Sequence, residues 1–120
     1  MKLNLIYCRN IQNYIGFNND LLYNIPEDMK YFKHITTQEY IKGHKNIVIM
    51  GYNTWKSIPD KFKPLDNRIN IVITNNHVIQ DAEDIVVTVN GEKEYKAKII
   101  GKDPLSDLAV LQIESKDKFS

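Results

Sequence analysis

Cysteine is almost absent from this chain, and neither sign of charge is in clear excess. The single Cys8 excludes an internal disulfide. Sixteen basic and fifteen acidic side chains leave a formal net charge of +1, which gives no strong attraction to nucleic acid or to a membrane surface. No apolar run approaches the ~20 residues that a membrane span needs. We therefore expect neither nucleic acid nor a membrane as a partner.

The first residues also lack the pattern of a signal peptide. Met1–Ile6 contains one lysine, but no long apolar run and no cleavage-like site follow it. We therefore expect a cytoplasmic location, or a protein that exists only as a recombinant product. With 120 residues, 42% hydrophobic and 26% charged, the chain has the size and composition of one globular domain with a real core.

Apolar runs separated by turn residues predict a mixed α/β domain. Short strands are expected at residues 3–8, 46–50 and 69–74, and a helix over residues 24–35 with Asn24 or Ile25 before it. A short helix capped by Asn53 or Thr54 connects the second and third strands, which predicts a parallel βαβ unit.

The second part of the chain predicts antiparallel structure. Asn90-Gly91 is a strong hairpin signal between strands at residues 84–90 and 94–100, and one further strand follows. The result is a parallel half-sheet with two helices, extended by a hairpin and a strand into a mixed sheet. The predicted core contains Leu5, Phe32, Ile47, Ile49, Trp55, Ile71 and Ile73, joined by Leu108, Val110 and Leu111.

Three local patterns suggest binding chemistry, and each has a simpler explanation. Asp28 shares a helix face with Phe32, which suits a hydrogen-bonding partner of a polar heterocycle, but a first-turn acid is also favoured by the helix dipole. Arg68 before a strand can grip a carboxylate, or can simply be solvated. Gly51 before a short helix can present N–H groups to an anion, or can be a cap without a ligand.

Two segments of the first part resemble signatures of the dihydrofolate reductase family: Leu22-Tyr-Asn-Ile-Pro-Glu-Asp-Met-Lys-Tyr-Phe-Lys33 and Met50-Gly-Tyr-Asn-Thr-Trp-Lys-Ser-Ile58. The resemblance covers about residues 2–76. It implies that Asp28 binds the pterin and supports its protonation, that Phe32 lies against the substrate, and that Arg68 holds the carboxylate of the folate tail. It also implies substrate contacts from Ile6, Ser57 and Ile58, and cofactor contacts from Gly16, Gly51, Thr54 and Thr74.

The resemblance to the reductases implies NADPH as cofactor, but two positions depart from the family pattern. Tyr23 stands where the family usually has a tryptophan that holds an ordered water near the pterin. Tyr52 stands where a basic residue commonly pairs with the 2′-phosphate of the cofactor, which weakens the preference for NADPH. We therefore expect no cofactor to bind tightly, and we find no metal-binding pattern.

The second part resembles a different family. Ile73-Thr-Asn-Asn-His-Val-Ile79 and the segment from Ile99 to Ile113 are similar to the histidine and aspartate segments of trypsin-like serine proteases of the high-temperature-requirement (Deg) type. The resemblance covers about residues 73–113 and implies His77 as general base and Asp107 as its orienting partner. No serine lies in a Gly-x-Ser-Gly context. The strand before His77 is expected to belong to a reductase-like parallel sheet and not to a protease barrel. We therefore expect the side chains of His77 and Asp107 to lie apart.

Together these observations predict a joined or truncated chain, with residues 1–76 reductase-like and residues 77–120 protease-derived, in one composite domain. The leading interpretation is a folded chimera without a complete active site, and we lean towards no enzymatic activity. The alternatives are a residual folate- or nucleotide-binding reductase fragment and a serine protease fragment that lacks its nucleophile. An open sheet edge also predicts a homo-oligomer.

Overall fold

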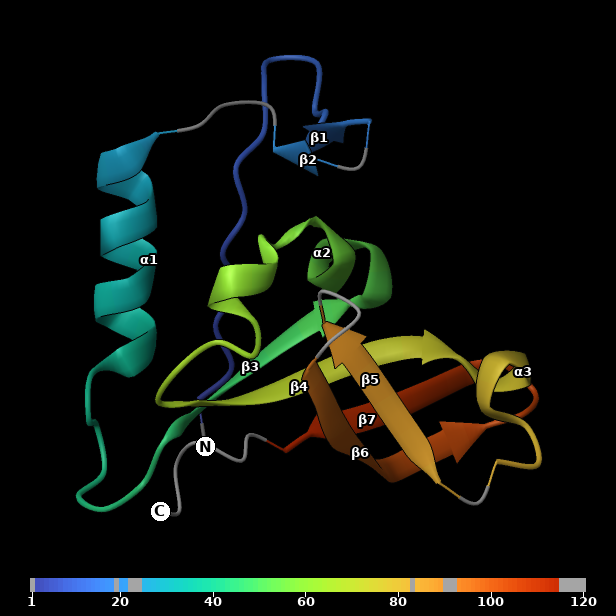
Figure 1. Cartoon of the computed structure of the whole chain (residues 1–120). Helices are drawn as coiled ribbons and strands as arrows, with labels where there is room; N and C mark the ends of the chain where they lie inside the picture. The colour runs from blue at the N-terminus through green and yellow to red at the C-terminus, as the bar shows by residue number, and fades with distance from the viewer. Residues whose placement is uncertain (1, 19, 22–24, 83, 90–92, 115–120) are drawn as a thin grey trace.

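The computed structural model describes residues 2–18, 20–21, 25–82, 84–89 and 93–114. Figure 1 shows one mixed sheet with helices around it and a small separate hairpin. The helices are α1 (Pro26–Thr37), α2 (Tyr52–Ser57) and α3 (Asn76–Ile79), with a 3₁₀ turn η1 (Asp60–Phe62). The strands are β1 (Gly16–Phe17), β2 (Asp20–Leu21), β3 (Asn46–Gly51), β4 (Arg68–Asn75), β5 (Ile85–Val89), β6 (Lys93–Asp103) and β7 (Leu108–Ile113).

The main sheet has five strands in the order β3-β4-β7-β6-β5. β3 and β4 run parallel, with Ile49 opposite Ile71, and α2 lies in the connection between them. On the side of β4 away from β3, β7 pairs with β4 antiparallel. β6 then pairs antiparallel with β7, and β5 pairs antiparallel with β6. The predicted mixed sheet, its parallel βαβ unit and its antiparallel extension are therefore confirmed. The hairpin residues Asn90-Gly91 lie outside the described residues.

The core lies on one face of this sheet, and the strand registers explain why. Met50 on β3 pairs with Val72 on β4, which pairs with Leu111 on β7, which pairs with Ile99 on β6, so these side chains share a face. Trp55 from α2 covers that face and is only 3% exposed. The buried members of the core are Met50, Trp55, Leu65, Val72, Val89, Tyr95 and Ile113, with a smaller cluster of Ile79, Ala109 and Leu111.

The opposite face of the sheet is only partly covered, which corrects the prediction for three core residues. Ile47 and Ile49 were expected to be buried on both faces of their strand, but they are 54% and 53% exposed. β3 is the edge of the sheet, and its side chains alternate between the core face and the open face. Leu108 was also expected in the core and is 46% exposed at the start of β7, whereas Ile71 and Leu111 are buried as expected.

The amino-terminal segment is a second correction. Residues 3–8 were expected to form a strand, but they have no strand assignment and Leu5 is 85% exposed. A strand forms only where a neighbour supplies the other half of its hydrogen-bond ladder. The described residues place no strand beside this segment. The short hairpin of β1 and β2 follows this segment.

The helices match their predicted positions more closely than their predicted caps. α1 begins at Pro26 after Ile25, and the alternative cap Asn24 lies outside the described residues. α2 begins at Tyr52, with Gly51 in the cap position and no side-chain cap hydrogen bond, so the prediction that Asn53 or Thr54 caps it is wrong. No helix in the described part of the chain combines the length and the apolar character needed to cross a membrane.

Replacing Ile71 by alanine tests the central position of β4. Ile71 is 6% exposed, so the substitution should lower the free energy of unfolding by about 2–4 kcal/mol and weaken the cooperative transition. Ile49→Ala is the matched control, because Ile49 is the register partner of Ile71 on the exposed edge strand. Chemical denaturation should show a much smaller loss for the control. Equal losses for the two variants would contradict the central position of β4.

Candidate functional site

Arg68 is a buried cation at the start of β4. Its side chain is held from two sides, because Nε donates to the carbonyl oxygen of Asp66 at 2.9 Å and Nη1 donates to Oγ1 of Thr36 at 3.1 Å. The guanidinium carbon lies 5.9 Å from the centre of the Phe32 ring on α1. The structure therefore brings together Arg68 and Phe32, two of the residues that the reductase resemblance assigned to the substrate.

Asn70 fixes the turn that presents Arg68. Its side-chain oxygen accepts a hydrogen bond from the backbone N–H of Leu65 at 2.9 Å, and its amide group donates to the carbonyl oxygens of Leu65 and Arg68 at 3.0 and 3.1 Å. Asn70 is only 2% exposed. The sequence analysis missed this residue, although a lone polar side chain between Ile69 and Ile71 in a buried strand is a signal of such a structural amide.

Asn46 fixes the helix that carries Phe32. From the first position of β3, its side-chain amide donates to the carbonyl oxygens of Thr36 and Gln38 at 3.0 and 2.7 Å, and so holds the end of α1 against the sheet. The pairing of Asn46 with Arg68 puts both anchors side by side. The carbonyl oxygen of Thr36 therefore accepts a hydrogen bond from Asn46 on β3, and its hydroxyl oxygen accepts one from Arg68 on β4.

Burial and a nearby acidic residue act in opposite directions on the pKa of Arg68. Burial lowers the pKa of the Arg68 guanidinium from its ordinary value, and the nearby charge of Asp66 opposes that effect. An arginine remains protonated at neutral pH despite such a decrease. Among the described residues, no carboxylate forms an ion pair with Arg68. This cation can therefore bind an anionic group from a ligand.

The remaining residues assigned to the substrate lie on α1, in the amino-terminal segment and at the end of α2. Asp28 is exposed on α1, one turn before Phe32. Ile6 is 47% exposed in the amino-terminal segment. Ser57 and Ile58 are half-buried at the end of α2, where Ile58 packs against the core.

The residues assigned to the cofactor fall at two places. Gly51 ends β3 and Thr74 lies near the end of the parallel strand β4, so both are at the same edge of the sheet, and Thr54 follows on α2. Ser57 Oγ donates to the carbonyl oxygen of Thr54 at 2.7 Å. Gly16 lies in the β1–β2 hairpin, where a Cβ atom would come within 2.7 Å of the Asp20 carbonyl oxygen, so a larger residue would force the hairpin apart.

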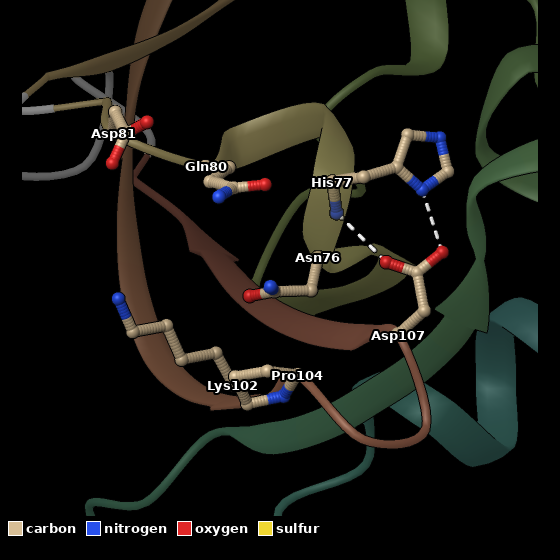
Figure 2. Close-up of a pocket in the computed structure, with 7 residues that line it drawn as sticks. All are labelled: Asn76, His77, Gln80, Asp81, Lys102, Pro104 and Asp107. Carbon is tan, nitrogen blue, oxygen red and sulfur yellow. Dashed lines mark hydrogen bonds and ion pairs between the residues drawn. The ribbon is translucent and has the colours of Figure 1, made fainter.

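His77 and Asp107 lie in direct contact, so the prediction that they would be separated is wrong. The imidazole Nδ1 is 2.6 Å from Oδ2 of Asp107, and the backbone N–H of His77 donates to Oδ1 at 2.8 Å. Figure 2 shows this two-point contact at the side of an open depression that Asn76, Gln80 and Lys102 also line.

The cause of this contact is the pairing of β7 directly with β4. Asn75 is opposite Leu108, so the turn before β7 returns to the start of α3. There the carbonyl oxygen of Asp107 accepts from the backbone N–H of Asn76 at 3.0 Å and from Nδ2 of Asn75 at 3.2 Å. The sequence analysis placed the hairpin between the two residues but did not predict which strand β7 would join.

The carboxyl group of Asp107 is an anion with a lowered pKa. The main cause is the hydrogen bond from the backbone N–H of His77, followed by the contact with the His77 side chain. Asp103 in the same turn also has a lowered pKa, first because the Ser106 hydroxyl group donates to it and then because of the Leu105 backbone N–H. Ser106 is therefore directed at Asp103 at 2.7 Å and not at the imidazole.

The sequence as a whole matches the family model for dihydrofolate reductase over residues 2–107. This chain belongs to the dihydrofolate reductase family. The match extends beyond residue 76 and includes both His77 and Asp107, and it gives no support to a protease portion or to a chimeric origin. The mixed sheet described above is consistent with the reductase fold.

Individual reductases agree with the family match. The chain is 37% identical to the dihydrofolate reductase of Saccharomyces cerevisiae over 89 residues, which are 72% of this chain and 42% of the yeast protein. It is 40% identical to that of Cryptococcus neoformans over 80 residues, 64% of this chain and 35% of that protein. It is 34% identical to that of Heliothis virescens over 113 residues, 92% of this chain and 61% of that protein. The chain thus spans roughly a third to three fifths of these relatives.

Within the described residues, no three histidine, cysteine, aspartate or glutamate side chains converge as a metal site would require. The free Cys8 is exposed in the amino-terminal segment.

The lowered pKa of Asp107 predicts how stability depends on pH. A carboxyl group whose pKa is lower in the folded chain stabilises the fold above its unfolded pKa of about 3.9, and that contribution is lost as the pH falls through the folded value. Thermal melting between about pH 6 and pH 3 should therefore show a steeper loss of stability in acid for the unmodified chain than for Asp107→Asn. Asp103→Asn serves as a comparison, because the pKa of Asp103 is also lowered. Identical pH profiles for the unmodified chain and the two variants would contradict the stabilising role given to the Asp107 carboxylate.

Proposed function

We propose that this chain binds a folate-type ligand through Asp28, Phe32 and Arg68. The single observation that carries the proposal is the buried Arg68 guanidinium, which is held beside the Phe32 ring without a carboxylate partner among the described residues. A fixed planar guanidinium binds a carboxylate in two places, and an aromatic ring beside it supports the flat part of the same ligand. A p-aminobenzoyl-glutamate tail combines these two groups.

The family assignment supports this proposal from a second side. Relatives that are 34–45% identical to parts of the chain are dihydrofolate reductases, alone or joined to thymidylate synthase. The role we assign to Asp28 is to hydrogen-bond the pterin ring from the exposed first turn of α1. Gly51, Thr54 and Thr74 at the sheet edge would contact a dinucleotide. NADPH is the cofactor that the resemblance implies, and Tyr52 weakens the preference for its 2′-phosphate.

A pair of ligands that differ in the tail tests the role of Arg68. Methotrexate has a glutamate tail, and Arg68→Gln should lower the affinity for it about ten- to hundredfold. The reason is that a hydrogen bond to a charged group contributes about 1.5–3 kcal/mol. Binding of 2,4-diaminopteridine, which has no tail, should be unchanged. Titration calorimetry or a thermal-shift assay measures both.

Two further variants make the ligand test specific. Lys33→Gln removes a positive charge from the exposed side of the same helix and should leave both affinities unchanged. Asp28→Asn should weaken both ligands, since it alters the contact with the pterin ring that they share. Equal losses of the two ligands in Arg68→Gln would show that Arg68 acts only through the fold, and would overturn its assignment to the tail.

The polypeptide of these 120 residues is expected not to reduce dihydrofolate by itself. Hydride transfer needs the pterin and the nicotinamide to be held in contact, and the chain corresponds to 42% of the yeast reductase. An assay of NADPH consumption with dihydrofolate should therefore show no turnover above background. An ordinary enzyme has a turnover rate of about 10 s⁻¹. A rate within roughly a hundredfold of that value would contradict this expectation.

The contact between His77 and Asp107 favours a second candidate function. The carboxylate receives both the imidazole and the backbone N–H of the same histidine, which is an arrangement that orients a general base. In this interpretation His77 is an oriented general base within the reductase-like chain, and the family match over residues 2–107 gives no support to a protease origin for it. Ser106, the nearest serine in sequence, donates to Asp103, so the described residues provide no serine for the imidazole.

A further inference from the structure

The His77 imidazole is anchored at one ring nitrogen and accessible at the other. Nδ1 faces the Asp107 carboxylate at 2.6 Å, while the side chain as a whole is 67% exposed. In Figure 2 the second ring nitrogen points away from the carboxylate. Because an ionised carboxylate can only accept, the Nδ1 proton belongs to this hydrogen bond. The neutral imidazole therefore presents the lone pair of Nε2 to solvent.

Asp107 cannot easily turn away from this position. Its second carboxylate oxygen accepts from the backbone N–H of His77 at 2.8 Å. Its own carbonyl oxygen is held by the backbone of Asn76 and the side chain of Asn75. The orientation of the imidazole is therefore fixed by a group that is itself hydrogen-bonded to β4 and to α3, and this pre-organisation is what a reactive imidazole needs.

We propose that His77 is a nucleophilic catalyst of the hydrolysis of activated carboxylic esters, with Asp107 as the positioning residue that fixes its tautomer. No serine is required. Nε2 lies on the exposed side of the ring, and it points away from the side chains of Asn76, Gln80 and Lys102 that line the depression. An open site of this kind suits small aryl esters with a short acyl group. The proposed folate-binding residues take no part, so this activity stands or falls independently of folate binding.

The reaction balances with water as the only co-reactant. Nε2 of His77 attacks the ester carbonyl carbon, a nitrogen–carbon bond forms, and the bond from that carbon to the aryl oxygen breaks. The aryloxide leaves with the electron pair, and the acylated ring keeps its Nδ1 proton against Asp107 as a cation. Water then attacks the acyl carbon, the nitrogen–carbon bond breaks with its electron pair returning to Nε2, the carboxylic acid departs, and one proton of the water goes to solvent. The imidazole is returned with its Nδ1 proton facing Asp107, as at the start.

Hydrolysis of p-nitrophenyl acetate, followed by release of p-nitrophenolate, tests the proposal on the full chain. The chain has three histidines, and His44 offers a matched control, because its Nδ1 lies 3.1 Å from a neutral carbonyl oxygen, that of Lys42, and not from a carboxylate. Three variants are compared with the unmodified protein: His77→Gln, His44→Gln and Asp107→Asn. Circular dichroism and thermal melting show which of them remain folded.

The expected result separates the oriented imidazole from an ordinary one. His77→Gln should remove most of the protein-dependent rate, and His44→Gln should leave it unchanged. Asp107→Asn should lower the rate about tenfold or more, since an amide can donate to Nδ1 and so impose the wrong tautomer. Asparagine readily adopts the left-handed backbone of this position, where φ is +55°, so the variant should fold.

Trapping the acyl group gives a second readout that a structural role would not change. Mass spectrometry of the protein quenched in acid should find the acetyl group on the peptide that contains His77 and not on the peptide that contains His44. Equal rate losses in the two histidine variants would overturn the proposal. So would an Asp107→Asn protein that is folded and reacts as fast as the unmodified chain.

Discussion

The position of β4 between β3 and β7 is the constraint on which the rest of the structure depends. One edge of β4 makes a parallel ladder with β3, and the other makes an antiparallel ladder with β7. The parallel side requires a crossover, which brings α2 and Trp55 over the sheet. The antiparallel side brings the turn before β7 to the end of β4. Both candidate sites lie at the ends of this one strand, with Arg68 at its start and His77 just beyond its last residue.

At the Arg68 site a buried charge is held by neutral groups, and within the described part of the chain no carboxylate forms an ion pair with it. The guanidinium group is satisfied by neutral oxygen atoms and by the face of an aromatic ring, while Asn70 and Asn46 fix the turn and the helix around it. Amide side chains suit this purpose because they donate and accept at the same time and carry no charge that would neutralise the arginine. The positive charge therefore remains available to a ligand.

The His77 site has the opposite character, because the carboxylate of Asp107 is paired with the imidazole and both side chains are exposed to solvent. The carboxylate of Asp107 is half-exposed, so its attraction to the imidazole is weakened by solvent and its main effect is to orient the ring. Family membership and local geometry differ in their implications here. The whole chain to residue 107 matches the dihydrofolate reductases, yet the His–Asp contact has the geometry of an oriented base. Orientation of this kind depends on strand pairing alone and does not require a protease fold.

Much of the local structure could be predicted from the residues. The 3.6-residue spacing of α1 and the apolar runs of β3 and β4 each depend on neighbours in the sequence, so those elements appear near their expected positions. The same motifs indicated Asp28, Phe32 and Arg68. Local pattern was misleading where a partner decides the outcome. Residues 3–8 look like a strand but have no ladder among the described residues, and Ile47 and Ile49 look buried but lie on an edge.

The sequence by itself determined the periodicity of the elements, the resemblance to a reductase and the chemical types of the candidate residues. Only the tertiary structure decided that Asp107 reaches His77, that Thr36 and Asn46 bind the end of α1 to the sheet, and that Arg68 has no carboxylate partner among the described residues. The physical reason is the same for each. Periodicity fixes which face a side chain occupies, whereas contact between distant residues depends on which strands pair and in which register, and many pairings are compatible with the same local pattern.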